Sequence, residues 1–369
     1  MDRTGRRDMV KSDIAHELLL SICIPTFNRK GLLMKTLHEL QKIQRSDVEF
    51  VVIDDLSTDG TREELEKIED KRLRVVVKKE KAHAHQTMID AIWAGKGRYI
   101  LYCNDRDILF ADKVEKLMKT LEQDEYSYVH VSKLKGVKGN SGNLHVYQAG
   151  ADSLLHQNLT HHPTGTVYNG EILRNRIKER QPYICFRENS CYSWDLLMTD
   201  LVWYAKSAEY DLGIYDEPGR DFYVTQISKA KTGKRSFYGD YTFQKELMVR
   251  FCGHVGGKCE KNLSPKDRQK VYSKIITYFT ENIIGYKFAS MDEAVMGYYG
   301  LEAKLVNTRK VLAIIRGFSI IRKDLCRKYG FYYSLTRRWQ SFWKIVSWSL
   351  YGDIKYYVFR LKGKEIIAT

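Results

Sequence analysis

The chain has 369 residues, 43% of them hydrophobic, which is enough for one large domain with a smaller one or for two medium domains. Only 5 prolines and 25 glycines argue against long disordered linkers, and 7 cysteines without a C-x-x-C pair fit a reducing cytosol. The net charge is +15, but residues 301–369 contain 15 of the 61 Lys and Arg against four acids, which favours an anionic partner for that segment.

Residues 1–17 are polar and basic and contain no apolar stretch, so they do not have the pattern of a signal peptide. No apolar run approaches the ~18 residues of a membrane-spanning helix. We therefore expect a cytoplasmic protein that is soluble or peripheral at the inner face of the cytoplasmic membrane.

Strands and helices are predicted to alternate through residues 18–134. Apolar runs predict strands within 18–30, 50–54, 72–79, 98–103 and 127–134, and helical periodicity predicts helices at 30–43, 61–69, 84–94 and 112–121. Asp112 is the expected cap of the last of these helices. Sequential β-α-β units predict the α/β class, with a mostly parallel sheet flanked by helices.

Polar residues follow three of the predicted strands at their carboxyl ends. They are Pro25-Thr26-Phe27-Asn28, the run DDLSTDGT that opens with Asp54 and Asp55, and Asn104-Asp105-Arg106-Asp107. Open α/β sheets bind ligands at the carboxyl ends of their strands. The sequence therefore predicts a ligand site lined by carboxylates at this edge.

In order and spacing, these three segments resemble the family-2 glycosyltransferases of the GT-A fold, which transfer sugars from nucleotide donors. The resemblance covers about residues 18–220 and is strongest over 18–110. It implies that Asp54 and Asp55, with the Pro25-Thr26 loop beside them, bind the base and ribose of a donor, most commonly UDP-linked. The common N-x-G and R-N elements of the family are absent from the next loop, residues 81–90.

The resemblance also implies that Asp105 and Asp107 hold Mg²⁺ or Mn²⁺, since hard oxygen ligands suit a metal that bridges diphosphate oxygens. One departure leaves metal dependence open. Arg106 stands where a principal metal-binding carboxylate of the family usually lies. A guanidinium there could instead pair with the diphosphate directly.

The segment 188–206 resembles the family's later acidic segment, in which an acid at the start of a helix is the general base of inverting transfer. This implies Asp195 as the base, with Trp194 in place of the usual Glu. Asp200 is the competitor, but five residues along a helix rotate a side chain by about 140°, so the two cannot both face the donor. The alternative for Asp195 is an ordinary acid at a helix N-terminus.

We expect an N-terminal polar segment (1–17), a GT-A catalytic domain (18–240) and a helical C-terminal region (241–369). Within the domain, 18–134 would be the nucleotide-sugar half and 135–240 the acceptor half. Ser264-Pro265 is a helix-start signal.

Near the C-terminus, Trp339, Phe342, Trp343, Val346 and Leu350 share one helical face, with basic residues opposite. Such a helix binds an anionic membrane surface or packs its aromatic residues on the catalytic domain. Both alternatives remain open.

The leading hypothesis is an inverting transfer from a nucleotide sugar to a glycan in bacterial cell-surface polysaccharide biosynthesis. A second is transfer to a polyprenyl phosphate from a GDP donor. A third is a non-catalytic, basic membrane- or nucleic-acid-binding protein with a decayed transferase domain. No nucleic-acid-binding module is recognisable, so we do not expect a nucleic-acid partner.

Overall fold

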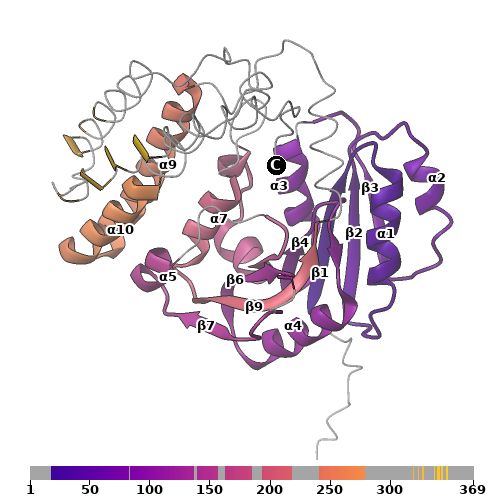
Figure 1. Ribbon diagram of the computed structural model, residues 1–369. Coiled ribbons are helices and arrows are strands. Elements are labelled where there is room, and N and C mark those ends of the chain that lie inside the picture. Colours follow the sequence, from indigo (N-terminus) through magenta and orange to yellow (C-terminus); the bar gives the residue numbers. More distant parts are fainter. Residues whose placement is uncertain are drawn as a thin grey trace, which may run out of the picture.

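The computed structural model describes residues 18–82, 84–136, 139–156, 163–184, 193–217 and 241–278, and single helical residues between 319 and 347 (Figure 1). Within these residues, nine strands form one sheet in the order β3-β2-β1-β4-β8-β6-β9-β5, with β7 paired to β9. The strands are β1 (Leu20–Thr26), β2 (Val48–Asp54), β3 (Leu73–Val77), β4 (Tyr99–Tyr102), β5 (Ile108–Leu109), β6 (Tyr126–Lys133), β7 (Leu144–Tyr147), β8 (Thr166–Asn169) and β9 (Lys206–Asp216).

Helices α1 to α4 lie at the predicted positions, and further helices follow them along the chain. The helices are α1 (Lys30–Leu40), α2 (Thr61–Leu65), α3 (Ala84–Ala94), α4 (Ala111–Gln123), α5 (Ala151–His156), α6 (Gly170–Ile172), α7 (Ser193–Leu201), α9 (Tyr241–Asn262) and α10 (Pro265–Tyr278), with single turns at Leu173–Ile177 and Gln181–Tyr183. The prediction that Asp112 caps α4 is wrong, because the helix begins one residue earlier with Phe110 at the N-cap. Asp112 lies in the first turn instead, where a carboxylate still suits the helix dipole.

The first half of the sheet is parallel and the second half is mixed. Strands β3, β2, β1 and β4 pair in parallel, as predicted from the β-α-β alternation. Strand β8 then runs antiparallel to both β4 and β6, and β5 and β7 run antiparallel to β9. Strands β1 and β2 are buried on both faces, which explains why their sequences are mostly apolar.

Helices lie on both faces of the sheet (Figure 1). Two hydrophobic clusters of buried side chains pack between the sheet and these helices. One contains Leu33, Leu37 and Leu40 of α1 with the apolar faces of α2 and α4. These α1 residues recur at helical spacing and are all buried. The other cluster contains the apolar residues of α3 and α7 and extends to α9 and α10.

The helices α9 and α10 pack against the domain and share its second hydrophobic cluster. The predicted start of α10 is confirmed, since the Ser264 hydroxyl accepts a hydrogen bond from the Asp267 amide at 3.2 Å. Further along α10, the Lys274 ammonium donates to the Leu154 carbonyl of α5 at 2.9 Å. The first part of the predicted C-terminal region therefore shares a core with the sheet.

Candidate functional site

The carboxyl ends of β1, β2 and β4 lie side by side, because the three strands are parallel neighbours. Strand β1 ends at Thr26, β2 ends at Asp54, and the segment Asn104–Asp107 follows β4. Each strand is buried up to this point, and the polar residues that end or follow these strands lie close together. All the donor-side and metal residues predicted from the sequence meet here: Pro25, Thr26, Asp54, Asp55, Asp105, Arg106 and Asp107.

Asp54 and Asp55 are both buried, and each lies next to a basic side chain. Asp54 is fully buried, accepts the Ser57 amide at 3.0 Å and pairs with the Arg62 guanidinium at 2.7 Å. Asp55 accepts the Ala82 amide at 2.9 Å and lies 3.8 Å from the Lys78 ammonium. Asp54 therefore fixes the loop after β2, and Asp55 connects that loop to the one after β3.

The loops after β1 and β2 are cross-linked by side chains. The Ser57 hydroxyl accepts the Asn28 amide at 2.9 Å, and the Asn28 side-chain oxygen accepts the Thr58 amide at 2.7 Å. Both loops include a residue with positive φ, Asn28 at 51° and Leu56 at 63°. Leucine is rarely found in this region, and strained residues of this kind concentrate at functional sites. Hydrogen bonds therefore hold the two loops together at the strand ends.

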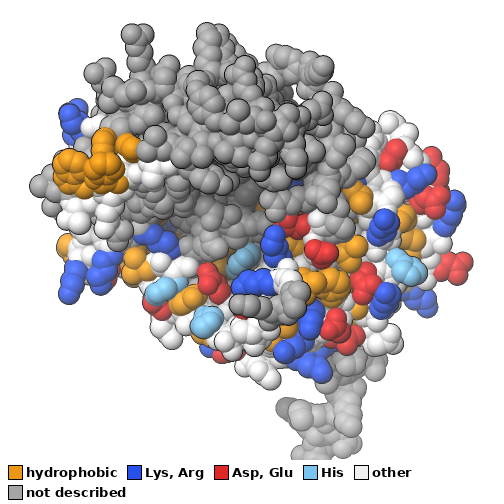
Figure 2. Space-filling view, viewed as in Figure 1, with side chains coloured by type: hydrophobic (Ala, Val, Ile, Leu, Met, Phe, Trp, Pro, Cys, Tyr) orange, Lys and Arg blue, Asp and Glu red, His pale blue; other side chains and the backbone are white. Residues whose placement is uncertain are grey.

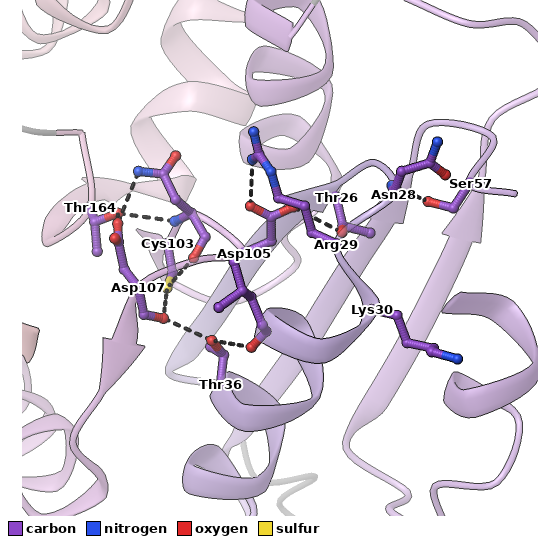
Figure 3. A network of polar contacts seen from close by, with 12 residues as sticks. Thr26, Asn28, Arg29, Lys30, Thr36, Ser57, Cys103, Asp105, Asp107 and Thr164 are labelled. Atoms are coloured by element: carbon purple, nitrogen blue, oxygen red, sulfur yellow. Dashed lines mark hydrogen bonds and ion pairs between the residues drawn. The ribbon is translucent and has the colours of Figure 1, made fainter. Parts of the chain in front are cut away.

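Asp105 lies between Thr26 and Arg29 (Figure 3). One carboxylate oxygen accepts the Thr26 hydroxyl at 2.9 Å, and the other accepts the Arg29 guanidinium at 2.8 Å. Its side chain is only 2% exposed, whereas that of Arg29 is 37% exposed. The carboxylate is thus directed at its own protein partners, and the guanidinium reaches the surface.

Asp107 points away from Asp105 in the same network (Figure 3) and is fully buried. One oxygen accepts the Thr164 hydroxyl at 2.5 Å and the Asn104 side-chain amide at 2.9 Å. Burial raises the pKa of this carboxyl group above its usual range, and these two hydrogen bonds and the Arg106 charge oppose that rise only in part. Asp107 therefore connects the end of β4 to the residues before β8.

Helix α7 begins with Ser193, so Asp195 is its third residue, as predicted for an acid that opens a helix. The side chain of Asp195 lies outside the described residues. Asp200 on the same helix is buried, accepts the Tyr183 hydroxyl at 2.5 Å and lies 2.8 Å from His254 Nε2 of α9. Asp200 is therefore part of the packing between α7 and α9.

Comparison with known proteins identifies the region that contains these strand ends. Residues 21–184 match the family model described as glycosyl transferase family 2. Residues 21–184 therefore resemble a family-2 glycosyltransferase domain. The resemblance seen in the sequence motifs is confirmed by this match.

Relatives and solved structures agree with this family-2 match. The Bacillus subtilis protein TuaG, named for teichuronic acid biosynthesis, is 31% identical over 27% of this chain and 41% of its own length. A Campylobacter jejuni GalNAc(5)-diNAcBac-PP-undecaprenol beta-1,3-glucosyltransferase is 28% identical over 30% of this chain and 36% of its own length. The matches thus span less than half of these relatives.

One solved structure resembles the chain over most of its length. Staphylococcus aureus TarS 1–349, in complex with UDP, superposes with a TM-score of 0.55 at 15% identity and covers 94% of this chain and 92% of that chain. The predicted GT-A fold is confirmed by this likeness.

The carboxylates of the matched region do not fit a metal site in the arrangement seen. Both oxygens of Asp105 already have protein partners, and Asp107 is fully buried. Among the described residues, no group of three or more His, Cys, Asp or Glu side chains is placed to hold a metal ion. Metal binding by Asp105 and Asp107 stays a prediction.

Sequence reasoning missed the residues that surround the strand-end acids. Arg29 directly follows the PTFN motif and could have been noticed as a base beside an acidic loop. Arg62 lies 8 residues after Asp54, on the helix that follows. Thr164 lies 57 residues after Asp107, and no local pattern signals that contact.

Proposed function

We propose that this chain is an inverting glycosyltransferase that moves a sugar from a UDP-sugar to a glycan acceptor. The observation that supports this most directly is the meeting of Thr26, Asp54 and Asp55 at one edge of the matched family-2 region. Ligands bind at this edge in open α/β sheets. In the proposed complex, Asp55 and the Pro25-Thr26 loop contact the base and ribose, and Asp54 fixes the loop that carries Asp55.

The proposed reaction is a direct displacement at the anomeric carbon. The acceptor oxygen forms a bond to that carbon from the face opposite the diphosphate, and the bond to the diphosphate oxygen breaks with its electron pair. The acceptor proton passes to a general base, for which we propose Asp195 at the start of α7. Burial of the strand-end carboxylates keeps their geometry fixed while charge moves to the diphosphate.

The charge of the leaving diphosphate needs a positive partner. Two candidates follow from the sequence: a divalent metal at Asp105 and Asp107, or basic side chains including Arg106. The protein contacts of Asp105 favour the second, because the Arg29 guanidinium beside this carboxylate would repel a metal ion.

A lipid-linked or cell-surface glycan is the proposed acceptor. The names of two relatives support this class, since one refers to teichuronic acid biosynthesis and the other to an undecaprenol-linked glycan. The proposed setting is therefore polysaccharide biosynthesis at the inner face of the cytoplasmic membrane.

Peripheral attachment through the C-terminal region fits such an acceptor. Trp339 and Trp343 are each 61% exposed, and Phe342 makes an edge-on ring contact with both. Figure 2 shows this hydrophobic patch at the upper left, where Figure 1 draws the C-terminal residues. Exposed tryptophans beside basic residues suit the interface of an anionic bilayer. No helix in the described residues is long and apolar enough to cross one.

The test of the proposed function is nucleotide release. Purified protein is incubated with a panel of UDP- and GDP-sugars, with and without an undecaprenyl-diphosphate glycan, and free nucleotide is measured. UDP release that increases with the glycan is the expected result. GDP release with polyprenyl phosphate would support the second hypothesis, and no release from any donor by folded protein would support a non-catalytic role.

A further inference from the structure

We propose that basic side chains at the strand-end edge, above all Arg29 and Arg106, neutralise the donor's diphosphate, so that donor binding needs no divalent metal. This inference rests on the proposed function and concerns only how the site balances charge. It follows from the partners of the carboxylates and from the position of the bases.

Asp105 already has hydrogen-bond partners within the protein. Its two oxygens accept from Thr26 at 2.9 Å and from Arg29 at 2.8 Å, and 2% of its side chain is exposed. A metal ligand must direct a lone pair at the ion and must give up competing donors. Here a positive guanidinium already occupies the position next to the carboxylate, and a cation placed there would be repelled by it.

Asp107 also has hydrogen-bond partners within the protein. Its side chain is fully buried, and one oxygen accepts from Thr164 at 2.5 Å and from Asn104 at 2.9 Å. Figure 3 shows it directed toward Thr164, away from Asp105. Arg106 stands between these two acids in the sequence. The two acids therefore do not converge on one point.

Acidic and basic side chains pair in the same way at the end of β2. Asp54 pairs with Arg62 at 2.7 Å, and Asp55 lies 3.8 Å from Lys78. The Arg62 side chain is 38% exposed, close to the 37% of Arg29. The acids of this edge are buried and their arginine partners reach the surface, so an incoming anion meets guanidinium groups first.

Guanidinium groups suit a diphosphate chemically. Arginine keeps its charge at all relevant pH values and presents planar N–H donors that match phosphate oxygens in pairs. A carboxylate that binds one side of the guanidinium leaves the N–H donors on its other side for a second anion. The buried acids would thus orient the arginines, and the arginines would stabilise the charge that develops as the sugar leaves.

The experiment is calorimetric titration of UDP into the full-length protein, in excess EDTA and in Mn²⁺. We expect the same dissociation constant in both. Arg106→Gln and Arg29→Gln should each weaken binding by about tenfold or more, the size expected for a hydrogen bond between charged groups. Arg45→Gln is the matched control, because Arg45 pairs with Asp47 before β2, at the opposite edge of the sheet.

Each other outcome has a defined meaning. Binding that is lost in EDTA and restored by Mn²⁺, with both arginine variants unaffected, would overturn this inference and leave the proposed function intact. No UDP binding in either condition would overturn the donor site and this inference together. Thermal unfolding tests whether Arg29→Gln destabilises the domain, because this substitution removes the partner of Asp105. If the variant is destabilised, the Arg106→Gln result alone decides.

Discussion

Asp200 of α7 and His254 of α9 lie 2.8 Å apart, from Oδ1 to Nε2, with the Tyr183 hydroxyl donating to the other side of the same carboxylate at 2.5 Å. Asp200 is buried, and His254 belongs to the predicted C-terminal region. The contact therefore connects that region to the helix that begins beside Asp195. Helix α9 is part of what positions α7 and is not an independent appendage.

Replacing Asp200 with Asn should destabilise the fold without weakening donor binding. The asparagine side chain has one acceptor oxygen and no charge, so it cannot replace the carboxylate as the partner of both Tyr183 and His254. We therefore expect the free energy of unfolding to fall by about 2 kcal/mol. Urea unfolding measures this loss, and UDP titration measures the donor site. Asp112→Asn is the control, since the Asp112 side chain is 73% exposed and its substitution should change neither quantity. Equal stability of the two variants would contradict a structural role for Asp200.

Lys274 should make stability depend on alkaline pH. Burial lowers the pKa of its ammonium from 10.5 to about 8, although the Glu209 charge opposes this. Between about pH 8 and 10.5 the unfolded chain then binds more protons than the folded chain, so this group makes the folded state more stable as pH rises through that window. Below about pH 8 its charge is retained in both states and the cost of burying it is fully present.

The measurement for Lys274 is urea unfolding of wild type and Lys274→Met from neutral pH to pH 10. Wild type should gain stability relative to the variant as pH rises. Lys270→Met on the same helix is the control, because the Lys270 side chain is 53% exposed and pairs with Asp267 at the surface. A wild-type advantage that shrinks with pH would show that the sign is wrong.

The parallel half of the fold could be predicted because its information is local. Helix α3 has the bounds expected from the sequence, Ala84–Ala94, and the strand ends fall where apolar runs stop. Buried strands in β-α-β order leave few alternative arrangements. The meeting of Asp54, Asp55 and Asp105 at one edge follows from that topology alone.

The second half and the pairing of charges could not be predicted in this way. Strand β8 is four residues long, and its antiparallel pairing with β4 and β6 depends on neighbours distant in sequence. The contact of Thr164 with Asp107 spans 57 residues. The periodicity of one sequence does not reveal such long-range contacts. The strand-end acids could therefore be predicted, but their partners could not.

Asp55 should be needed for donor binding. It lies at the end of β2, and its carboxylate faces the loop after β3. Asp55→Asn keeps its size but loses the charge and one acceptor for the base or ribose, so we expect the UDP dissociation constant to rise by about tenfold or more. Calorimetry measures this. Asp70→Asn is the matched control, because Asp70 pairs with Arg72 before β3 at the opposite edge. Asp54→Ala should lower both affinity and stability, since Asp54 also fixes Ser57 and Arg62.

The exposed tryptophans should carry membrane attachment. Replacing Trp339 and Trp343 with Ser removes apolar surface that is 61% exposed at each position, so sedimentation with anionic liposomes should fall. High salt or deletion of residues 331–369 should have the same effect, since screening weakens attraction to anionic lipid. Tyr204→Ser, on a side chain that is 45% exposed elsewhere, is the control. If the double variant sediments as much as wild type, the tryptophans do not attach the protein to the membrane.

Asp195 should be the general base. It is the third residue of α7, and the contact of Asp200 with His254 positions the same helix. Direct displacement requires deprotonation of the acceptor hydroxyl as it attacks, and a positioned base typically contributes ~10²–10⁴-fold. Asp195→Asn keeps size and hydrogen bonding but removes basicity, so kcat should drop within that range while UDP affinity stays unchanged. Steady-state kinetics with saturating donor measure the drop, with Asp112→Asn as control. A kcat close to wild type would assign Asp195 to the helix terminus alone and require another base on the acceptor side.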